Sequence, residues 1–142
     1  MQLVNHVLDR KGRNIISVKP DDSVLEAIRV MAEKNIGAVV VMQDDSLIGI
    51  MSERDYARKV IVKGRASDTT PVSNIMTSDV FTATGGETVN NCMATMTEKK
   101  IRHLPVVEDG TVVGMISIGD LVEAIIADQQ EEIEQLEHYI SG

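Results

Sequence analysis

Two short segments place a hydroxyl side chain and a carboxylate at the same spacing. The first, "GIMSERD", contains Ser52 and Asp55, and the second, "GMISIGD", contains Ser117 and Asp120. A serine followed three residues later by an acid at a helix start is close to a capping box, in which each side chain bonds a backbone amide. A helix start also offers free amides that attract anions. The pattern therefore fits either helix capping or the binding of an anionic, hydroxylated ligand.

Cationic side chains accompany both segments, but they come from different places. Arg54 lies between Ser52 and Asp55, whereas Arg102 and His103 precede the second segment by about a dozen residues. An arginine can bind a phosphate through charge-assisted, bidentate hydrogen bonds. The alternative for Arg54 is a solvated surface charge of little energetic consequence. Because the cations differ between the copies, we expect two inequivalent sites.

The two segments belong to a tandem repeat with an offset of 65 residues. Residues 17–55 align without a gap with residues 82–120, and 10 of the 39 pairs are identical. A lead-in repeats as well, because residues 4–9 match residues 72–77. Internal repetition of this kind determines the architecture before any local pattern is considered.

Each copy predicts the element order β-α-β-β-α. Apolar residues at helical spacing follow Ser23 in the first copy and Thr88 in the second. Asp44–Asp45 and Asp109–Gly110 suit hairpin turns between two apolar strands. The expected strands are residues 15–18, 38–42 and 47–51 in the first copy, and 80–83, 104–107 and 112–116 in the second.

These elements predict an α+β (α/β) fold of two repeats related by a pseudo-twofold. A unit of three strands and two helices is too small to cover both faces of its sheet, so the repeats should share a core. We expect residues 1–65 to form the first repeat with its lead-in. Residues 66–127 should form the second repeat with its linker, and residues 128–142 a C-terminal helical extension.

Composition excludes several classes of function. The 142 residues carry 14 basic and 22 acidic side chains, a net charge of −8, and three aromatic residues, which argues against nucleic-acid binding. No apolar run reaches the length of a signal peptide or membrane span, so a cytoplasmic protein without membrane contact is expected. The lone Cys92 fits a small buried hydrophobe. The three histidines lack zinc-ligand spacing, and no nucleophile or acid–base set stands out, so neither a metal nor an enzyme is predicted.

The duplicated β-α-β-β-α units with "GIMSERD" and "GMISIGD" resemble a pair of cystathionine β-synthase (CBS) domains, also called a Bateman module. The resemblance covers residues 4–126. The phrases "MSERDYARKV", "KGR", "IRHLPV" and "MISIGDLVEAI" further resemble small stand-alone CBS-pair proteins of bacteria and plant organelles. The resemblance implies a regulatory module that binds AMP, ADP, ATP, NAD(H) or S-adenosylmethionine in a cleft between the repeats.

The resemblance also implies roles for residues at matching positions. Asp55 and Asp120 would accept hydrogen bonds from ribose hydroxyls, while Ser52 and Ser117 would donate to phosphate. The other candidate ligand-binding residues are Ser17 and Thr82 at the cleft edge, the adenine-side residues Ala38, Val39, His103, Leu104 and Pro105, and the cations Arg54 and Arg102.

The C-terminal segment and the partners are the remaining expectations. Ile126, Ile133 and Ile140 recur every seven residues, but Gln129 interrupts the pattern, so we expect this helix to lie across its own module or a second subunit. CBS pairs commonly form flat dimers, and a homodimer that signals to an unidentified regulated protein is predicted. The alternative is a structural interaction module with an empty cleft, in which both aspartates only cap helices.

Overall fold

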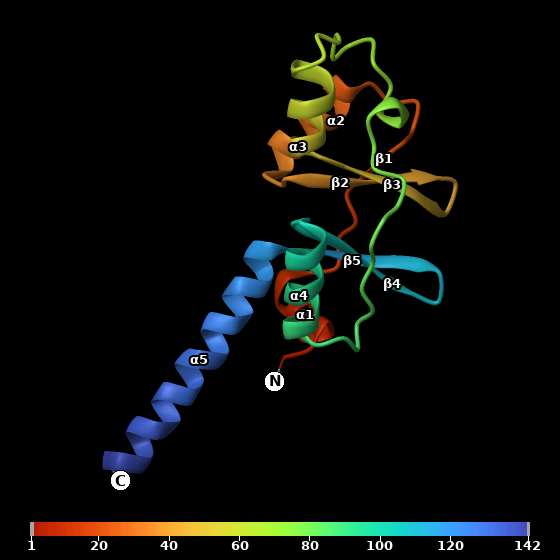
Figure 1. Cartoon of the computed structure of the whole chain (residues 1–142). Helices are drawn as coiled ribbons and strands as arrows, with labels where there is room; N and C mark the ends of the chain where they lie inside the picture. Colours follow the sequence, from red (N-terminus) through yellow and green to blue (C-terminus); the bar gives the residue numbers. More distant parts are fainter. Residues whose placement is uncertain (1, 142) are drawn as a thin grey trace. The chain divides into compact units, whose positions relative to one another are not determined.

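The computed structural model describes residues 2–141 and confirms a mixed α+β fold with two repeats (Figure 1). The first repeat and its flanks contain α1 (Val4–Lys11), β1 (Ser17–Val18), α2 (Val24–Lys34), β2 (Ala38–Gln43), β3 (Ser46–Ser52), α3 (Glu53–Tyr56), a π-helical turn (Ala57–Ile61) and a 3-10 turn (Val72–Asn74). The remainder contains α4 (Val89–Lys99), β4 (His103–Glu108), β5 (Thr111–Ser117) and α5 (Ile118–Ser141).

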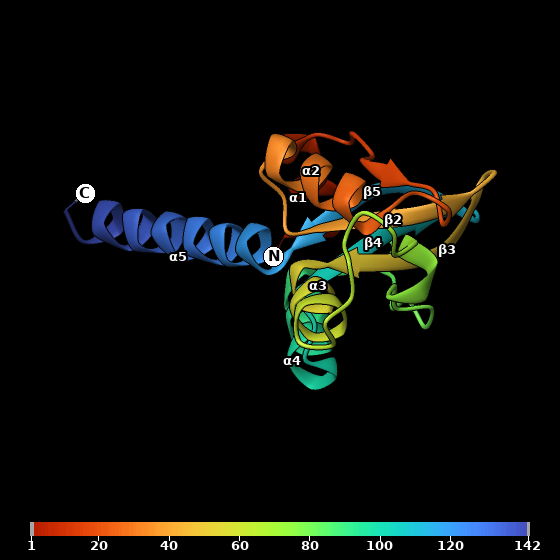
Figure 2. The same cartoon turned by 90° about the horizontal axis from the view of Figure 1, so that it is seen from above.

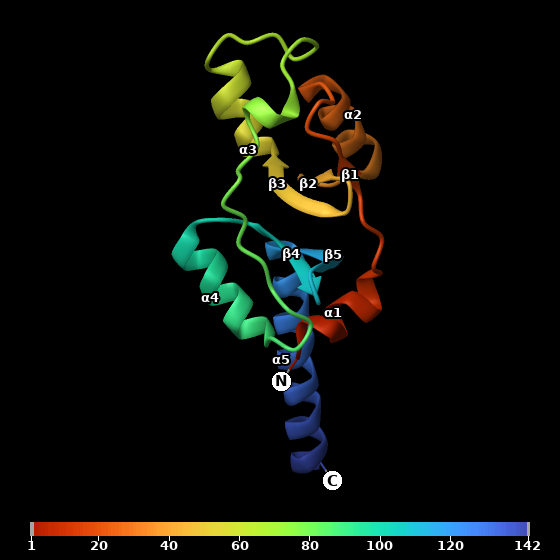
Figure 3. The same cartoon turned by 90° about the vertical axis from the view of Figure 1, so that its right-hand side faces the viewer.

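The two compact units of the chain differ from the predicted boundaries. One unit combines Met1–Asn14 with Thr82–Gly142, and the other is Ile15–Phe81. The expected division at residues 65 and 66 assigned each lead-in to the repeat that follows it in sequence. Instead, the first lead-in folds with the second repeat, and the second lead-in folds with the first repeat. The reason is packing, because α1 contacts both β5 and α5 and adds three side chains to their core (Figure 3).

The glycine of each repeated segment lies against the lead-in that completes its unit. A Cβ atom on Gly114 would lie 2.7 Å from Cδ2 of Leu8, and one on Gly49 would lie 2.5 Å from Sδ of Met76. Leu8 and Met76 occupy equivalent positions in the repeated lead-ins. The glycine therefore allows close packing of the lead-in on the strand, a role that helix capping alone does not require.

The unit Ile15–Phe81 contains a three-stranded sheet that matches the prediction. β1 is parallel to β2, and β2 is antiparallel to β3. Ser23 caps α2 by accepting a hydrogen bond from the Glu26 amide at 3.1 Å. The predicted apolar side of α2 faces the core, where Val24, Ala27 and Met31 are buried. The helix ends at Asn35, whose backbone is left-handed.

The other unit contains the β4–β5 hairpin, and the short strand expected at residues 80–83 is reduced to one bridging residue. Only Ala83 pairs with β4, in a single parallel bridge to Val106. Its amide donates to the Pro105 carbonyl at 2.9 Å, and its carbonyl accepts from the Val107 amide at 2.8 Å. Pro105 has no N–H group to continue this ladder toward residue 81, whereas the equivalent Val40 has one. The proline therefore limits the first strand of the second repeat to one residue.

Both predicted hairpin turns are confirmed. Gln43 pairs with Ser46 across the first turn, and Glu108 pairs with Thr111 across the second. In the second turn, Asp109 and Gly110 have φ angles of 51° and 78°. Positive φ at both central residues is the geometry that favours tight antiparallel hairpins.

α5 begins at the end of β5 and runs as one helix of 24 residues (Figures 1 and 2). Its first turns pack on α4, β5 and α1, with Leu121 and Ala124 buried. Gln2 fixes this part of the helix, since its amide nitrogen donates to the Ala124 carbonyl at 3.0 Å and to Asp128 at 2.9 Å. Beyond Asp128 every described side chain is exposed. The expected C-terminal helical extension therefore continues α5 past the part that packs on its own unit.

Candidate ligand-binding site

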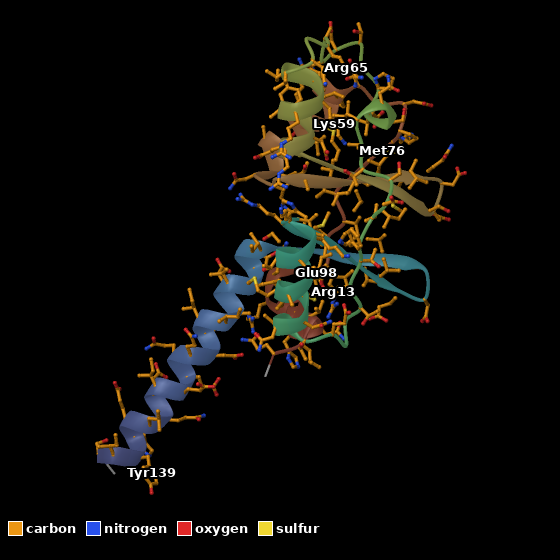
Figure 4. All side chains as sticks on the ribbon, in the orientation of Figure 1. Arg13, Lys59, Arg65, Met76, Glu98 and Tyr139 are labelled. Carbon is orange, nitrogen blue, oxygen red and sulfur yellow. The ribbon has the colours of Figure 1, made fainter. Side chains whose placement is uncertain are left out.

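Ser52 and Asp55 form a closed capping box where β3 meets α3. The Asp55 amide donates to Ser52 Oγ at 3.2 Å, and the Ser52 amide donates to Asp55 Oδ2 at 2.9 Å. The other oxygen, Oδ1, accepts from Lys59 Nζ at 3.0 Å and from Thr77 Oγ1 at 3.4 Å. Asp55 is only 9% exposed. Both oxygens of this carboxylate therefore have partners inside their own unit (Figure 4 labels Lys59).

Ser117 and Asp120 form the matching box at the start of α5, with a different distribution of partners. The Asp120 amide donates to Ser117 Oγ at 3.2 Å, and the Ser117 amide donates to Asp120 Oδ2 at 2.8 Å. Lys11 Nζ also approaches Oδ2, at 2.5 Å, and donates to the Met115 carbonyl at 2.7 Å. The hydrogen bonds that Lys11 and the Ser117 amide donate to this carboxylate both end on Oδ2. Neither of these two donors uses Oδ1.

His103 adds a titratable group to the second box. It is opposite Ser117 in the β4–β5 ladder. Burial lowers the pKa of His103 below its ordinary value of 6.5, and the nearby Lys11 and Arg102 cations lower it further, while Asp120 opposes them. The imidazole is therefore neutral at pH 7 and can either donate or accept a hydrogen bond there.

Replacing Lys11 with methionine is expected to raise the pKa of His103. In the wild-type protein the folded chain binds a proton to His103 less readily than the unfolded chain, so stability falls as the pH drops below about 6.5. Without the Lys11 charge this loss should be smaller. The pKa can be read from NMR titration of the His103 ring. An Arg13→Met variant is the control because Arg13 pairs instead with Asp9, and an unchanged His103 pKa in Lys11→Met would exclude the proposed charge effect.

The first backbone amide of the helix that follows each serine already donates a hydrogen bond. It is therefore not available to the expected anion. The Glu53 amide donates to the Gly37 carbonyl at 3.1 Å, and the Ile118 amide donates to the Arg102 carbonyl at 2.8 Å. The third amide is capped by serine in both repeats. Fewer helix-start amides are therefore open to a phosphate than the sequence suggested. Binding of a phosphate would depend more on the side-chain cations.

The predicted site residues fall into one group in each compact unit. Ala38 is opposite Ser52 in the β2–β3 ladder, just as His103 is opposite Ser117. Ala38, Val39, Leu104 and Pro105 are buried strand residues, whereas Ser17, Arg54, Thr82 and Arg102 are exposed. Thr82 lies outside any strand, next to the single bridge at Ala83. The structure thus brings the strand, serine and aspartate candidates of each repeat together, while Ser17 pairs farther along β2, with Val40.

Three polar neighbours of the aspartates were missed by the sequence reasoning. Lys59 lies four residues after Asp55, a spacing that predicts a side-chain pair on a helix. This contact could therefore have been predicted from the sequence. Thr77 and Lys11 reach Asp55 and Asp120 from the two lead-ins. Neither could be found without knowing which lead-in folds with which repeat.

The remaining candidate features of the sequence are the lone cysteine, the metal-ligand residue types and the apolar helices. Cys92 is 1% exposed, and burial together with Glu87 raises the pKa of its thiol to about 11, so the thiol is protonated at neutral pH. Within residues 2–141, no three His, Cys, Asp or Glu side chains gather in a way that could hold a metal ion. No helix in the same range is long and apolar enough to cross a membrane.

Comparison with known proteins identifies the family of the chain. The CBS domain model matches residues 7–62 and 72–127. The mitochondrial CBS domain-containing protein CBSX3 of Arabidopsis thaliana is 39% identical over 98% of this chain and 72% of its own length. A putative signal-transduction protein with CBS domains from Burkholderia ambifaria is 46% identical, with a TM-score of 0.87 over 90% of this chain and 96% of that one.

A third similar structure contains ligands. The CBS domain pair of protein MJ0100, solved in complex with 5′-methylthioadenosine and S-adenosyl-L-methionine, is 26% identical, with a TM-score of 0.80 over 89% of this chain and 98% of that one. The two matches to the CBS domain model together span most of the sequence. The two capping boxes occupy equivalent places in the two matched segments. The chain belongs to the CBS domain family and contains two CBS domains.

Proposed function

We propose that this chain is a regulatory sensor that binds an adenosine-containing ligand and passes its occupancy to a partner protein. The ligand class is AMP, ADP, ATP or NAD(H), with S-adenosylmethionine as the further candidate. Binding shifts a conformational equilibrium only by the difference in affinity for two states. The partner must therefore recognise a state that the ligand stabilises. No chemical step is assigned to the chain.

The environment of Asp120 carries this proposal. Its Oδ1 is an acceptor suited to a ribose hydroxyl, and the side chain is 19% exposed. Lys11 pairs with this carboxylate, and the charges of Lys11, Arg102 and Asp120 all act on the neighbouring His103. A carboxylate with the cations Lys11 and Arg102 in its neighbourhood matches a ligand that combines sugar hydroxyls with phosphate. The adenosine ligands of the MJ0100 CBS pair support the same ligand class.

The first repeat favours a more structural role. Lys59, Thr77 and Ser52 already occupy both oxygens of Asp55. A ligand hydroxyl would have to replace or share these partners. We therefore expect the second repeat to bind more tightly, and the alternative of an interaction module applies best to the first repeat.

The ligand can be identified by thermal unfolding with AMP, ADP, ATP, NAD, NADH and S-adenosylmethionine. A ligand present at a hundred times its dissociation constant stabilises the folded state by about 2.7 kcal/mol, which raises the melting temperature by roughly 5–10 °C for a chain of this size. We expect a selective shift with one of them. If none shifts the transition and the denatured protein releases no nucleotide, the sensor proposal is wrong.

The assembly and location of the protein are also proposals. We expect a homodimer, since two repeats alone leave helix faces uncovered. The cytoplasmic assignment stays a prediction, and the mitochondrial CBSX3 relative provides a second compartment to test.

A further inference from the structure

One face of α5 carries a heptad pattern of exposed apolar residues. Successive positions are separated by four, three, four, three and four residues, which is the spacing of a coiled-coil seam. We call this face the α5 seam. It consists of Val122, Ile126, Gln129, Ile133, Leu136 and Ile140. The apolar members, in this order, are 42%, 58%, 48%, 62% and 82% exposed.

The α5 seam is distinct from the face that packs on the repeat. Leu121 and Ala124 are buried, and Ile125 packs against the same core. At 100° per residue, the seam lies roughly 110° around the helix from this buried face. Figure 1 and Figure 2 show α5 continuing away from α4 and the hairpin of its own unit, and Figure 4 shows Tyr139 near its far end. The seam therefore has no covering element within its own unit.

We propose that the α5 seam joins a second copy of this chain as a parallel two-stranded coiled coil. Isoleucine occupies three a positions, Ile126, Ile133 and Ile140, and Leu136 occupies a d position. β-branched residues at a with leucine at d favour two parallel strands. The helix also does not have to nucleate, because it begins inside the folded repeat, and nucleation is the unfavourable step for short helices.

Gln129 selects the parallel register. It is the one polar residue of the α5 seam, at a d position. In a parallel pair Gln129 meets its own copy, and the two amides can hydrogen-bond. In an antiparallel pair with matched ends it would face Ile133, and its amide would be buried without a partner, which is costly.

The flanks of the α5 seam set the conditions of assembly. In a parallel pair Glu132 at g faces Glu137 at e of the other copy, and both are exposed. Their repulsion is screened by salt and removed by protonation. Self-association should therefore strengthen with added salt and at mildly acidic pH. A basic partner helix on the same seam would show the opposite salt dependence.

This inference deepens the homodimer proposal and does not depend on nucleotide binding. The full chain is examined by sedimentation velocity at low and high NaCl concentration. We expect a dimer that tightens with salt, a monomeric Ile133→Glu variant, and a dimeric Glu131→Gln control, since Glu131 lies on the outer face. A monomeric wild type overturns both the seam and the homodimer. A dimer that persists in the Ile133→Glu variant, or that weakens with added salt, overturns only the α5 seam as the dimer contact. The same conclusion follows if a basic amphipathic peptide, added to the full chain, binds to the α5 seam.

Strand direction is tested by disulfide cross-linking of an Ile140→Cys variant. In a parallel pair the two introduced thiols are adjacent, whereas in the antiparallel pair they are about 27 Å apart. We expect a disulfide-linked dimer on oxidation, and none from Glu131→Cys. The native Cys92 is 1% exposed and does not compete. Absence of the Ile140→Cys cross-link in a dimeric sample overturns the parallel arrangement.

Discussion

Replacing Leu8 with alanine is expected to lower the free energy of unfolding by about 2–5 kcal/mol, the usual range for a buried leucine. Leu8 is fully buried and belongs to the core of the second repeat, although it precedes the first repeat in sequence. Its side chain fills the space over Gly114. The loss of stability measures how much the first lead-in contributes to the stability of the second repeat. It can be determined by urea denaturation.

The control for Leu8→Ala is the exposed neighbour Arg10 on the same helix. Arg10→Ala should change stability by less than about 0.5 kcal/mol. A Gly114→Ala variant tests the contact from the other side, because its Cβ would clash with Leu8 and overpack the core at about 1–3 kcal/mol. Combining Leu8→Ala with Gly114→Ala should cost less than the sum of the two. Additive losses would mean that the lead-in and the strand do not touch.

Replacing Asp120 with asparagine is expected to weaken ligand binding roughly 10- to 150-fold, because a hydrogen bond to a charged acceptor contributes about 1.5–3 kcal/mol. Asparagine can still accept the Ser117 amide, so the box should stay closed. It can present an N–H group where the ribose hydroxyl needs an acceptor. Asp55→Asn should have the smaller effect, since both Asp55 oxygens already have partners. Calorimetric titration of each variant measures the loss.

A control variant is needed that loses stability but keeps its affinity for the ligand. Ser23→Ala removes the cap of α2 and should cost about 1 kcal/mol of stability. It should leave the dissociation constant unchanged, because Ser23 belongs to neither box. If Asp120→Asn binds as tightly as Ser23→Ala, Asp120 serves only as a cap.

The sequence was sufficient for the features that depend on local pattern. Apolar spacing predicted the buried sides of α2 and α4, and the Asp–Gly pair predicted the β4–β5 turn. The Ser-x-x-Asp spacing suggested helix capping as one of its two interpretations, and a capping box is present in both repeats. Each of these depends on residues within a few positions of one another, where backbone geometry leaves few choices.

Features that depend on distant contacts could not be predicted in the same way. Leu8 and Gly114 are far apart in sequence, and no periodicity links a lead-in to the repeat it completes. Lys11 reaches Asp120 only because α1 packs on β5 and α5. Pro105 is different, since its missing N–H was visible in the sequence, but the expectation of a strand at residues 80–83 did not take it into account.

The central claim is that a box aspartate recognises the ribose of an adenosine ligand. Its most direct test is a calorimetric cycle that combines wild type and Asp120→Asn with the selected nucleotide and its 2′,3′-dideoxy analogue. We predict that removal of the ribose hydroxyls weakens binding at least about tenfold in the wild type, and that this difference largely disappears in Asp120→Asn. Equal affinity of the wild type for both nucleotides would contradict the claim.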